Sequence, residues 1–269
     1  DLLGSRGLGD VYKRQIFSMV LESNIKDNSL ILSFNSPETS NSISAEDWKE
    51  LKKQIKDFEQ SEIKYLVLNR VNDNFSSGAQ LAENLNASME DVSEASKILW
   101  ECKKPVISVV DGVCAGAASN MILLSDFIIA TPETRFIEVF ARRGLVVDFS
   151  GSWILPRIIG VQKAKELMMT ASEVNGETLD KFGLLYKLSE KAELDNELDN
   201  LINLLDKQSF ISICMIKDQI RKGLNSNFDD SLENETINQN DRFIHSDVME
   251  GMSAFIEKRQ PNYKNTLDE

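Results

Sequence analysis

The stretch Gly112–Thr131, GVCAGAASNMILLSDFIIAT, decides the fold of this chain. It follows Val106–Val110, a Val-rich apolar run after Pro105 that predicts a buried strand. Small residues come next, then an apolar helical stretch, and Phe127–Ala130 predicts a second strand. A strand that enters a turn of small residues and then a helix leaves backbone N–H groups unpaired, and a ligand oxygen can approach them closely. Tight packing of a helix on a sheet is the alternative explanation for these small residues.

A second stretch repeats this arrangement earlier in the chain. Lys64–Arg70 reads as a strand, and after a polar turn it is followed by Phe75–Leu81, FSSGAQL, in which Gly again stands beside Ser and Ala. Open α/β sheets bind ligands at the carboxyl ends of their parallel strands, so we expect the two loops to converge on one crevice. Two N–H groups aimed at one point form an oxyanion hole.

These two loops resemble those of the crotonase superfamily, also called the enoyl-CoA hydratase/isomerase family. Its members write the first loop as F-[SC]-[AS]-G-x-[DQ]-[LI] and the second as G-x-[AC]-x-G-[AG]-[AG]-x-x-[LM]; this chain has FSSGAQL and GVCAGAASNM. The resemblance runs from about Val20 to Tyr263. It also rests on the following segments: Ser125-Asp126-Phe127, Gly144–Asp148, Leu155-Pro156-Arg157 with Gly160, Glu250-Gly251-Met252, Phe255, and Glu257-Lys258-Arg259.

The resemblance implies an α/β fold, namely a spiral of ββα units with a helical carboxyl-terminal part, and assembly as a homotrimer or a dimer of trimers. The sequence by itself supports mixed α/β structure with a helical end. We expect a core over residues 19–205 and a helical trimerisation or lid region over residues 206–265. Residues 1–18 lack a hydrophobic period and the apolar core of a signal peptide, so we interpret them as a non-native or disordered leader. A disordered targeting tail is the alternative.

Charge and composition exclude several classes of function. The net charge of −13 argues against nucleic acid as the main partner, because phosphate neutralisation needs basic clusters. The apolar runs are shorter than the roughly 18–20 residues that span a bilayer, so no membrane partner is expected. Three cysteines in apolar or helical surroundings indicate reduced thiols and a cytoplasmic location. A single histidine makes a zinc site improbable, and we expect no metal and no cofactor apart from the coenzyme A thioester substrate.

The two glutamates that activate water in hydratases of this family are absent at the matching positions. The resemblance assigns those positions to Asn120 and Phe140, and neither side chain can act as a base. Simple enoyl-CoA hydration is therefore disfavoured. The pattern is most similar to isomerases of the ring-1,2-epoxyphenylacetyl-CoA type.

Asp148 matches the acidic residue that several isomerases of the superfamily place after Gly-Leu-[Val/Ala]-Pro, with Val147 here in place of the proline. The resemblance makes Asp148 the catalytic base and the backbone N–H groups of Ala79 and Ala117 the oxyanion hole. Desolvation by Val146, Val147, Phe149 and Trp153 is expected to raise the pKa of Asp148. A helix N-cap is the alternative role for this residue, and the two roles are compatible.

The remaining site residues are also carried over from the resemblance. The substrate pocket is assigned to Ser77, Gly78, Gly116, Asn120, Phe140, Phe149 and Trp153. Coenzyme A binding is assigned to Asn41, Gln80, Leu81, Phe255 and Lys258. For Lys258 the favourable interaction of a cation with the end of a helix is an equal explanation.

These observations favour an acyl-CoA isomerase that moves a double bond by proton transfer through an enolate. Another reaction of the superfamily with the same acid is the first alternative: hydration, hydrolysis, decarboxylation or ring opening. A non-catalytic acyl-CoA-binding subunit is the second, because both hydratase glutamates are missing. Proton exchange into the α position of enoyl-CoA thioesters would discriminate between the enzyme and the binding subunit.

Overall fold

A computed structural model describes residues 21–80 and 89–264 of the chain. The expected leader, residues 1–18, lies outside the described residues. The main sheet has the order β1-β2-β3-β4-β6-β9, in which β1 pairs antiparallel with β2 and every other pair is parallel. Its strands are β1 (Leu21–Lys26), β2 (Ser29–Phe34), β3 (Tyr65–Arg70), β4 (Val106–Val110), β6 (Phe127–Ala130) and β9 (Lys187–Leu188).

A smaller sheet stands at the carboxyl ends of the main strands. Its order is β5-β7-β8, with β5 parallel to β7 and β8 antiparallel to β7. The strands are β5 (Val113–Ala115), β7 (Arg135–Ile137) and β8 (Glu173–Asn175). Because β5 follows β4 directly and runs into α3 (Ala117–Leu123), the Gly112–Thr131 stretch connects the two sheets.

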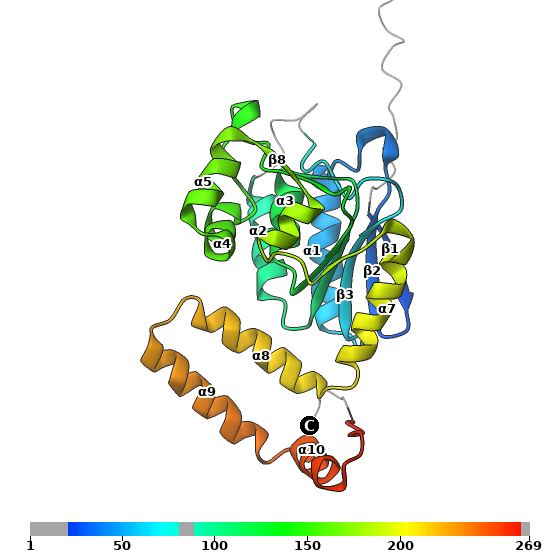
Figure 1. Cartoon of the computed structure of the whole chain (residues 1–269), viewed down its shortest axis with the longest axis vertical. Coiled ribbons are helices and arrows are strands. Elements are labelled where there is room, and N and C mark those ends of the chain that lie inside the picture. The colour runs from blue at the N-terminus through cyan, green and yellow to red at the C-terminus, as the bar shows by residue number, and fades with distance from the viewer. Residues whose placement is uncertain (1–20, 81–88, 265–269) are drawn as a thin grey trace, which may run out of the picture.

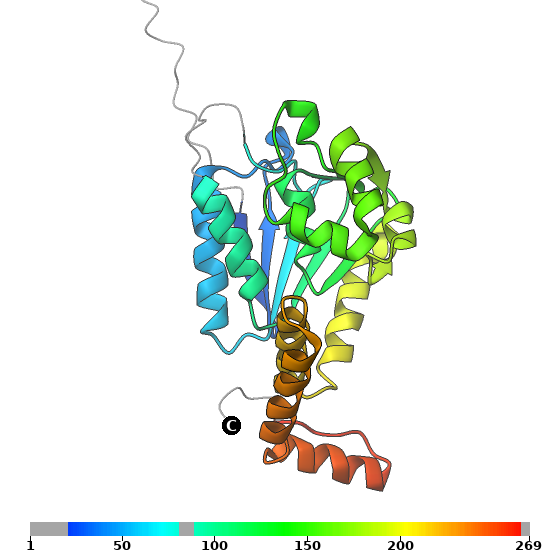
Figure 2. The same ribbon diagram turned by 90° about the vertical axis from the view of Figure 1, so that its left-hand side faces the viewer.

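The central strands of the main sheet, β3, β4 and β6, are buried on both faces, and the alternation of side chains along β3 shows how. Leu66 and Leu68 join the larger core cluster, which includes residues of α1 and α2, whereas Tyr65 and Val67 join a second cluster with residues of α7. Figures 1 and 2 show α1 and α2 on one side of the sheet and α7 on the other. These helices are α1 (Ala45–Glu59), α2 (Met89–Glu101) and α7 (Leu194–Leu205).

Local sequence signals set several helix ends. Ser44 and Asp47 form a capping box at the start of α1, with each side chain bonded to the backbone of the other residue. Pro156 lies inside α4 (Gly151–Ile159), and the chain breaks at Gly160, where the next helix begins. The remaining elements of the core are α5 (Val161–Thr170), α6 (Gly176–Lys181), and the 3-10 turns Pro37–Thr39, Ala141–Arg143 and Lys191–Glu193.

The helices after α7 form an arm that leaves the body of the molecule (Figures 1 and 2). The arm is anchored at its base, where Phe210 packs edge-on against Tyr65 and Lys217 bonds Asp126. Beyond that base its helices expose many large apolar side chains, including Phe228 and Phe255. The helices are α8 (Phe210–Gly223), α9 (Phe228–Arg242) and α10 (Ser246–Glu257).

Candidate active site

The first of the two loops, residues 76–80, is held by pairing with Ile43. The Ile43 N–H donates to the carbonyl of Gly78 at 2.8 Å, and the Gln80 N–H donates to the carbonyl of Ile43 at 2.9 Å. Ile43 and Ala79 are thus the two partners of a parallel bridge. In such a bridge the residue between the two bonded neighbours turns its own N–H away from the partner strand. The Ala79 N–H therefore points to the side opposite Ile43.

The second loop ends at the first turn of α3. Gly116 has φ +59° and ψ −127°, a conformation that suits glycine, and its N–H donates to the carbonyl of Ile137 at 2.9 Å. Ala117 is the first residue of α3, so its N–H has no acceptor one turn earlier in the helix. The turn of small residues therefore presents a backbone donor, as the sequence predicts.

The two loops touch each other at Gly78. A Cβ atom on this glycine would lie 2.5 Å from the carbonyl oxygen of Ala115 and 3.2 Å from the nitrogen of Ala117, so only glycine fits there. The loops are also joined by main-chain bonds, Ser76 N–H to Val113 and Ala115 N–H to Ser76. Gly78, the residue before Ala79, therefore lies directly against the start of α3. An oxyanion hole would need two backbone donors aimed at one point.

Asp148 lies in the turn that precedes α4 and is only partly exposed. Burial raises the pKa of its carboxyl group to about 6. The side-chain oxygen Oδ1 is buried and has no hydrogen-bond partner among residues 21–80 and 89–264. The main-chain carbonyl of Asp148 accepts a bond from the Gly151 N–H at 3.0 Å. The carboxyl group is therefore desolvated, and its Oδ1 makes no hydrogen bond with the described residues.

Asn120 links the Asp148 turn to the second loop. It lies on α3 one turn after Ala117, is fully buried, and donates from Nδ2 to the carbonyl of Asp148 at 2.9 Å. A Cβ atom on Gly151 would lie 2.2 Å from Asn120 Oδ1, so the turn closes directly onto this amide. The structure therefore brings Asp148 to the same end of α3 as the Ala117 N–H.

The aromatic residues expected to line the pocket differ in their positions. Phe140 is buried, and its Cζ atom lies 3.8 Å from where a Cβ of Gly116 would stand, so this ring is next to the second loop. Trp153 is half-buried and packs edge-on against Trp100 at 5.0 Å between ring centroids. Phe149 is 2% exposed and packs on Trp48 in the core, which corrects its expected place in the pocket wall.

A second correction concerns the apolar residues that were expected to desolvate Asp148. Val146 is 87% exposed, so it does not cover the carboxyl group within this chain. Val147 and Trp153 are partly buried on either side of Asp148 in the sequence. Val146 therefore does not supply the desolvation that raises the pKa of Asp148.

Asn41 holds the first loop in place. Its side chain is fully buried, accepts from the Ser36 N–H at 2.6 Å, and donates to the carbonyls of Asn74 and Phe75 at 2.7 and 3.1 Å. This side chain has no surface with which to contact a nucleotide, so its expected binding role is corrected to a structural one. Ser77 belongs to the same network, with its N–H on the carbonyl of Ser40 at 2.9 Å.

The other expected coenzyme A contacts do not form one group within a single chain. Gln80 is half-buried next to Ala79, whereas Leu81 lies outside the described residues. Phe255 is 81% exposed on α10, and Lys258 is the exposed C-cap of the same helix. Figures 1 and 2 show α10 on the arm, away from α3. These two residues therefore do not reach the loops of their own chain.

Sequence reasoning missed Glu138, which immediately follows β7. Its side chain is fully buried, and burial raises the pKa of its carboxyl group to about 8. The Asn120 amide and the Asp148 carboxyl are both close enough to act on that pKa, the amide lowering it and the carboxyl raising it. The available signal was a single acid inside the apolar run Phe136–Phe140.

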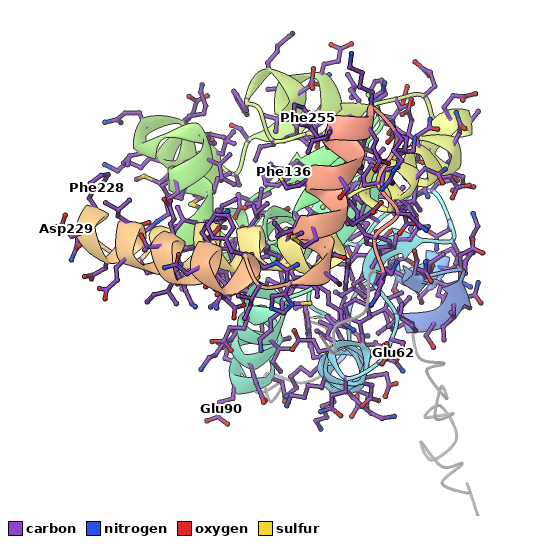
Figure 3. The ribbon with its side chains drawn as sticks, turned by 90° about the horizontal axis from the view of Figure 1, so that it is seen from below. Glu62, Glu90, Phe136, Phe228, Asp229 and Phe255 are labelled. Carbon is purple, nitrogen blue, oxygen red and sulfur yellow. The ribbon has the colours of Figure 1, made fainter. Side chains whose placement is uncertain are left out.

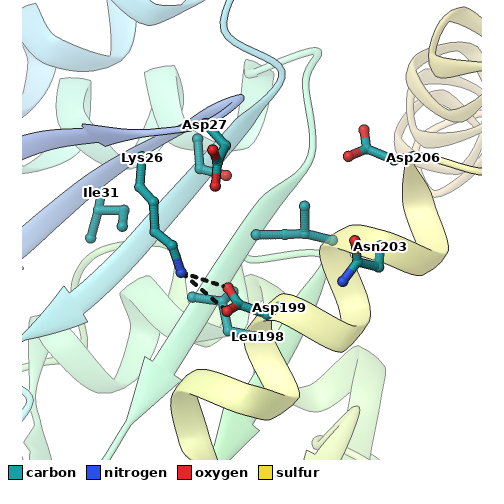
Figure 4. A pocket seen from close by; sticks show the side chains of 9 residues that line it. Lys26, Asp27, Ile31, Leu198, Asp199, Asn203 and Asp206 are labelled. Atoms are coloured by element: carbon teal, nitrogen blue, oxygen red, sulfur yellow. Dashed lines mark hydrogen bonds and ion pairs between the residues drawn. The ribbon is translucent and has the colours of Figure 1, made fainter.

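A small pocket of about 240 Å³ lies elsewhere, between the β1–β2 turn and α7 (Figure 4). Its Lys26 and Asp199 form an exposed ion pair at 2.9 Å. The residues that line this pocket belong to neither residues 76–80 nor the second loop before α3, so the pocket is separate from the candidate active site. Across the described ranges, residues 21–80 and 89–264, no group of His, Cys, Asp and Glu could hold a metal ion. No helix within those same ranges is long and apolar enough to cross a membrane.

Comparison with known proteins identifies the family of this architecture. The family model for enoyl-CoA hydratase/isomerase matches residues 24–266. The trans-2-decenoyl-[acyl-carrier-protein] isomerase of Streptococcus mutans is 31% identical over 252 residues, which cover 89% of this chain and 96% of that protein. The 1,2-epoxyphenylacetyl-CoA isomerase of Escherichia coli is 28% identical, with 90% and 97% covered. Proteins named as hydratases also match, among them a short-chain-enoyl-CoA hydratase of Clostridium acetobutylicum at 26% identity.

Solved structures give the same fold. An enoyl-CoA hydratase from Polaromonas sp. JS666 superposes with a TM-score of 0.85 at 26% identity, covering 91% of this chain and 99% of that one. A protein from Geobacillus kaustophilus, titled as an enoyl-CoA hydratase subunit, has a TM-score of 0.86 at 22% identity, covering 92% and 99%. The expected crotonase-type α/β fold with a helical carboxyl-terminal part is therefore confirmed. The chain is a member of the enoyl-CoA hydratase/isomerase family, the crotonase superfamily.

Proposed function

We propose that this protein is an acyl-CoA thioester isomerase that moves a double bond by proton transfer through Asp148. The observation that carries the proposal is the partly buried carboxyl group of Asp148, with a raised pKa of about 6 and one buried oxygen free of partners among the described residues. An unperturbed aspartate, with a pKa of about 3.9, is a much weaker base. Desolvation makes Asp148 suitable for accepting and returning a proton near neutral pH.

The proposed reaction has two proton transfers and one enolate. Asp148 removes a proton from a carbon next to the double-bond system, and the electron pair moves through the carbon chain to the thioester oxygen. The N–H groups of Ala79 and Ala117 hold that oxygen as it gains charge, and each such donor is typically worth about 2.7–4 kcal/mol. The same carboxyl group then returns the proton to a carbon two positions away, and the double bond moves. No redox cofactor or metal is needed for these steps.

Two further observations favour isomerisation over hydration. Asn120 and Phe140 stand where hydratases of the family are expected to carry their two glutamates, and an amide and a phenyl ring cannot activate water. Two of the relatives, from Streptococcus mutans and Escherichia coli, are named as isomerases. A single carboxylate suffices for isomerisation, because the group that removes a proton from one carbon becomes the acid that returns a proton to another.

The proposal is tested with a panel of enoyl-CoA thioesters in deuterated water. We expect deuterium to enter the α or γ carbon and the double bond to move between the 2 and 3 positions, detected by NMR and mass spectrometry. A 3-hydroxyacyl product would instead establish hydration. Exchange without a change in double-bond position would retain the enolate step and reject isomerisation. Tight binding without exchange would establish a non-catalytic binding subunit.

We also propose that the chain assembles as a homotrimer, or as a dimer of trimers, through the arm. Phe228 is 78% exposed at the outer end of α9 and Phe255 is 81% exposed on α10 (Figure 3). Large apolar surfaces that are exposed in one chain indicate an interface. Other exposed apolar residues of the arm are Ile216, Ile220, Leu232, Ile237, Phe243, Ile244, Met249, Met252 and Ile256. Light scattering on the purified protein should give three or six times the mass of the chain, and a monomer would reject the assembly.

A further inference from the structure

Two buried polar side chains, Glu138 and Asn120, lie behind the Asp148 turn. Glu138 and Asn120 are both fully buried, and the Asn120 amide acts on the Glu138 carboxyl at close range. Within the described part of the chain, both carboxyl oxygens of Glu138 and the Oδ1 of Asn120 lack hydrogen-bond partners. Asn120 uses Nδ2 to bond the carbonyl of Asp148. A cluster of unpaired acceptors inside a protein is costly unless a donor is present.

One proton on Glu138 would supply the hydrogen-bond donor that these buried acceptors lack among the described residues. A carboxylate has only acceptors, whereas a carboxylic acid has one O–H donor and one carbonyl acceptor. A carboxylic acid therefore matches a primary amide in a paired arrangement, with O–H donated to the amide oxygen and one amide N–H donated to the acid carbonyl. The second hydrogen on Asn120 Nδ2 remains on the carbonyl of Asp148.

We propose that Glu138 is a positioning residue that remains a neutral acid, pairs with the Asn120 amide, and so holds the Asp148 turn against α3. The consequence for isomerisation rests on the function proposed above for Asp148. Glu138 is fully buried and does not touch the substrate surface, so it acts through Asn120. In this pairing the Asn120 amide has one orientation, because its oxygen accepts from the acid and its nitrogen donates both to the acid and to the Asp148 carbonyl.

The Asp148 turn needs such support. Phe149 and Ser150 have φ of +47° and +60°, a region that non-glycine residues adopt at a cost. Gly151 closes the turn directly against the Asn120 amide, where a Cβ would lie 2.2 to 2.3 Å from the amide atoms. A turned or displaced Asn120 side chain would therefore release two strained residues next to the proposed base.

Ionisation of Glu138 would break this arrangement. The titratable groups that face Glu138 are the Asp148 carboxyl and the Cys114 thiol. Burial raises the pKa of both groups. A carboxylate at position 138 has no proton to donate to Asn120, and it repels an ionised Asp148. Activity should consequently decline as pH rises through about 8, the pKa of Glu138.

Two variants of Glu138 and one control test the proposal through the pH profile of isomerisation. Glu138→Gln keeps a donor and an acceptor for the Asn120 amide and cannot ionise, so it should keep kcat within about threefold and lose the alkaline decline. Glu138→Leu removes the pairing, so kcat should fall roughly tenfold or more, with a smaller change in KM. Glu133→Gln alters an exposed acid just before β7 and should leave the profile unchanged. Equal activity of the Gln and Leu variants, or an alkaline decline that persists in Glu138→Gln, would overturn the proposal.

A stability measurement tests the same proton without any activity. The pKa of Glu138 is raised from near 4.5 to about 8 in the folded state, so the unfolded chain loses this proton first as pH rises. Glu138 should therefore make the free energy of unfolding fall between pH 4.5 and 8. Asp148 contributes a similar fall only up to about pH 6, so the fall between pH 6 and 8 reports on Glu138. The melting temperature of Glu138→Gln should decline less than that of the wild type and of Glu133→Gln between pH 6 and 8.

The two readouts separate this inference from the proposed function. If no thioester is isomerised but Glu138→Gln removes the decline in melting temperature, the isomerase proposal fails and the neutral acid stands. If isomerisation occurs but the decline is the same in Glu138→Gln and in the wild type, the neutral acid is rejected and the isomerase stands. Should Glu138→Leu fail to fold, the Gln variant and the control still decide the question.

Discussion

The side-chain amide of Asn120 donates a hydrogen bond to the main-chain carbonyl of Asp148, with 2.9 Å between Nδ2 and the oxygen. This contact joins the helix that begins at Ala117 to the turn that carries the candidate base. The position at which a hydratase of the family is expected to carry a glutamate is therefore occupied here by a residue that fixes the backbone of another acid. The contact ties the proposed base to the helix whose first residue carries one of the proposed oxyanion donors.

Replacement of Asp148 by Asn should remove proton transfer while leaving substrate binding within a few-fold. The amide has nearly the same shape but cannot accept a proton as a base, so deuterium exchange should fall by roughly 10²–10⁴-fold. Exchange is followed by NMR, and acyl-CoA binding is followed by calorimetry. Asp180→Asn on the exposed surface of α6 serves as the matched control. Near-full turnover in Asp148→Asn would reject the assignment of the base.

The rate of isomerisation should depend on the ionisation of Asp148. Burial raises its pKa to about 6, and only the carboxylate can take a proton. The value of kcat/KM should therefore fall about tenfold for each pH unit below 6 and level off above it, until the decline expected near pH 8 from Glu138. The stability contribution has the opposite sign, because the raised pKa makes the folded state lose stability as pH rises from near 3.8 to 6. A midpoint of the rate profile near pH 4 would contradict the desolvated base.

Replacement of Ala117 by Pro should remove one of the two proposed oxyanion donors without breaking α3. Proline is well accepted at the first position of a helix, where its missing N–H has no helical acceptor. Loss of one such donor costs about 10²–10³-fold in kcat in enzymes that use an oxyanion hole. The variant Ala117→Gly keeps the N–H and should retain most of the activity. Circular dichroism and melting temperature establish that both variants are folded, and equal kcat values would exclude a role for this N–H.

Replacement of Asn41 by Ala should destabilise the protein rather than weaken ligand binding. The side chain satisfies the Ser36 N–H and the carbonyls of Asn74 and Phe75 in a fully buried setting. Asn also tolerates the positive φ of +58° at this position better than Ala. The loss of free energy of unfolding should be about 3 kcal/mol, measured by urea denaturation. Asn35→Ala, which removes an exposed bond to Glu22, should change stability by less than about 0.5 kcal/mol.

The fold was largely accessible from the sequence, because its signals are local. Val106–Val110 and Phe127–Ala130 form the adjacent parallel strands β4 and β6, as their apolar runs predict. A capping box at Ser44 and Asp47 is a similarly local signal for the start of α1. Pro156 is accommodated inside α4, because a proline near the end of a short helix removes only one N–H donor.

The site was less accessible, because burial and partner choice depend on distant parts of the chain. The glycine pattern located both loops, yet the sequence did not indicate that Gly78 would meet the backbone of Ala115 and Ala117. Val146 and Phe149 flank Asp148 with similar hydrophobicity, but one is exposed and the other is in the core. Glu138 resembled any charged residue next to a strand, and only the fold reveals that it is enclosed beside Asn120.

The contact at Gly78 has a consequence for how this scaffold can diversify. The proposed oxyanion donors are backbone atoms of two loops packed against each other, so exchanging side chains nearby leaves these donors in place. Asp148 stands on a separate segment, where Leu145 and Val146 are exposed. Under the proposed mechanism, new substrates or altered reactions can therefore arise by substituting a few residues of that segment, while the backbone donors stay unchanged.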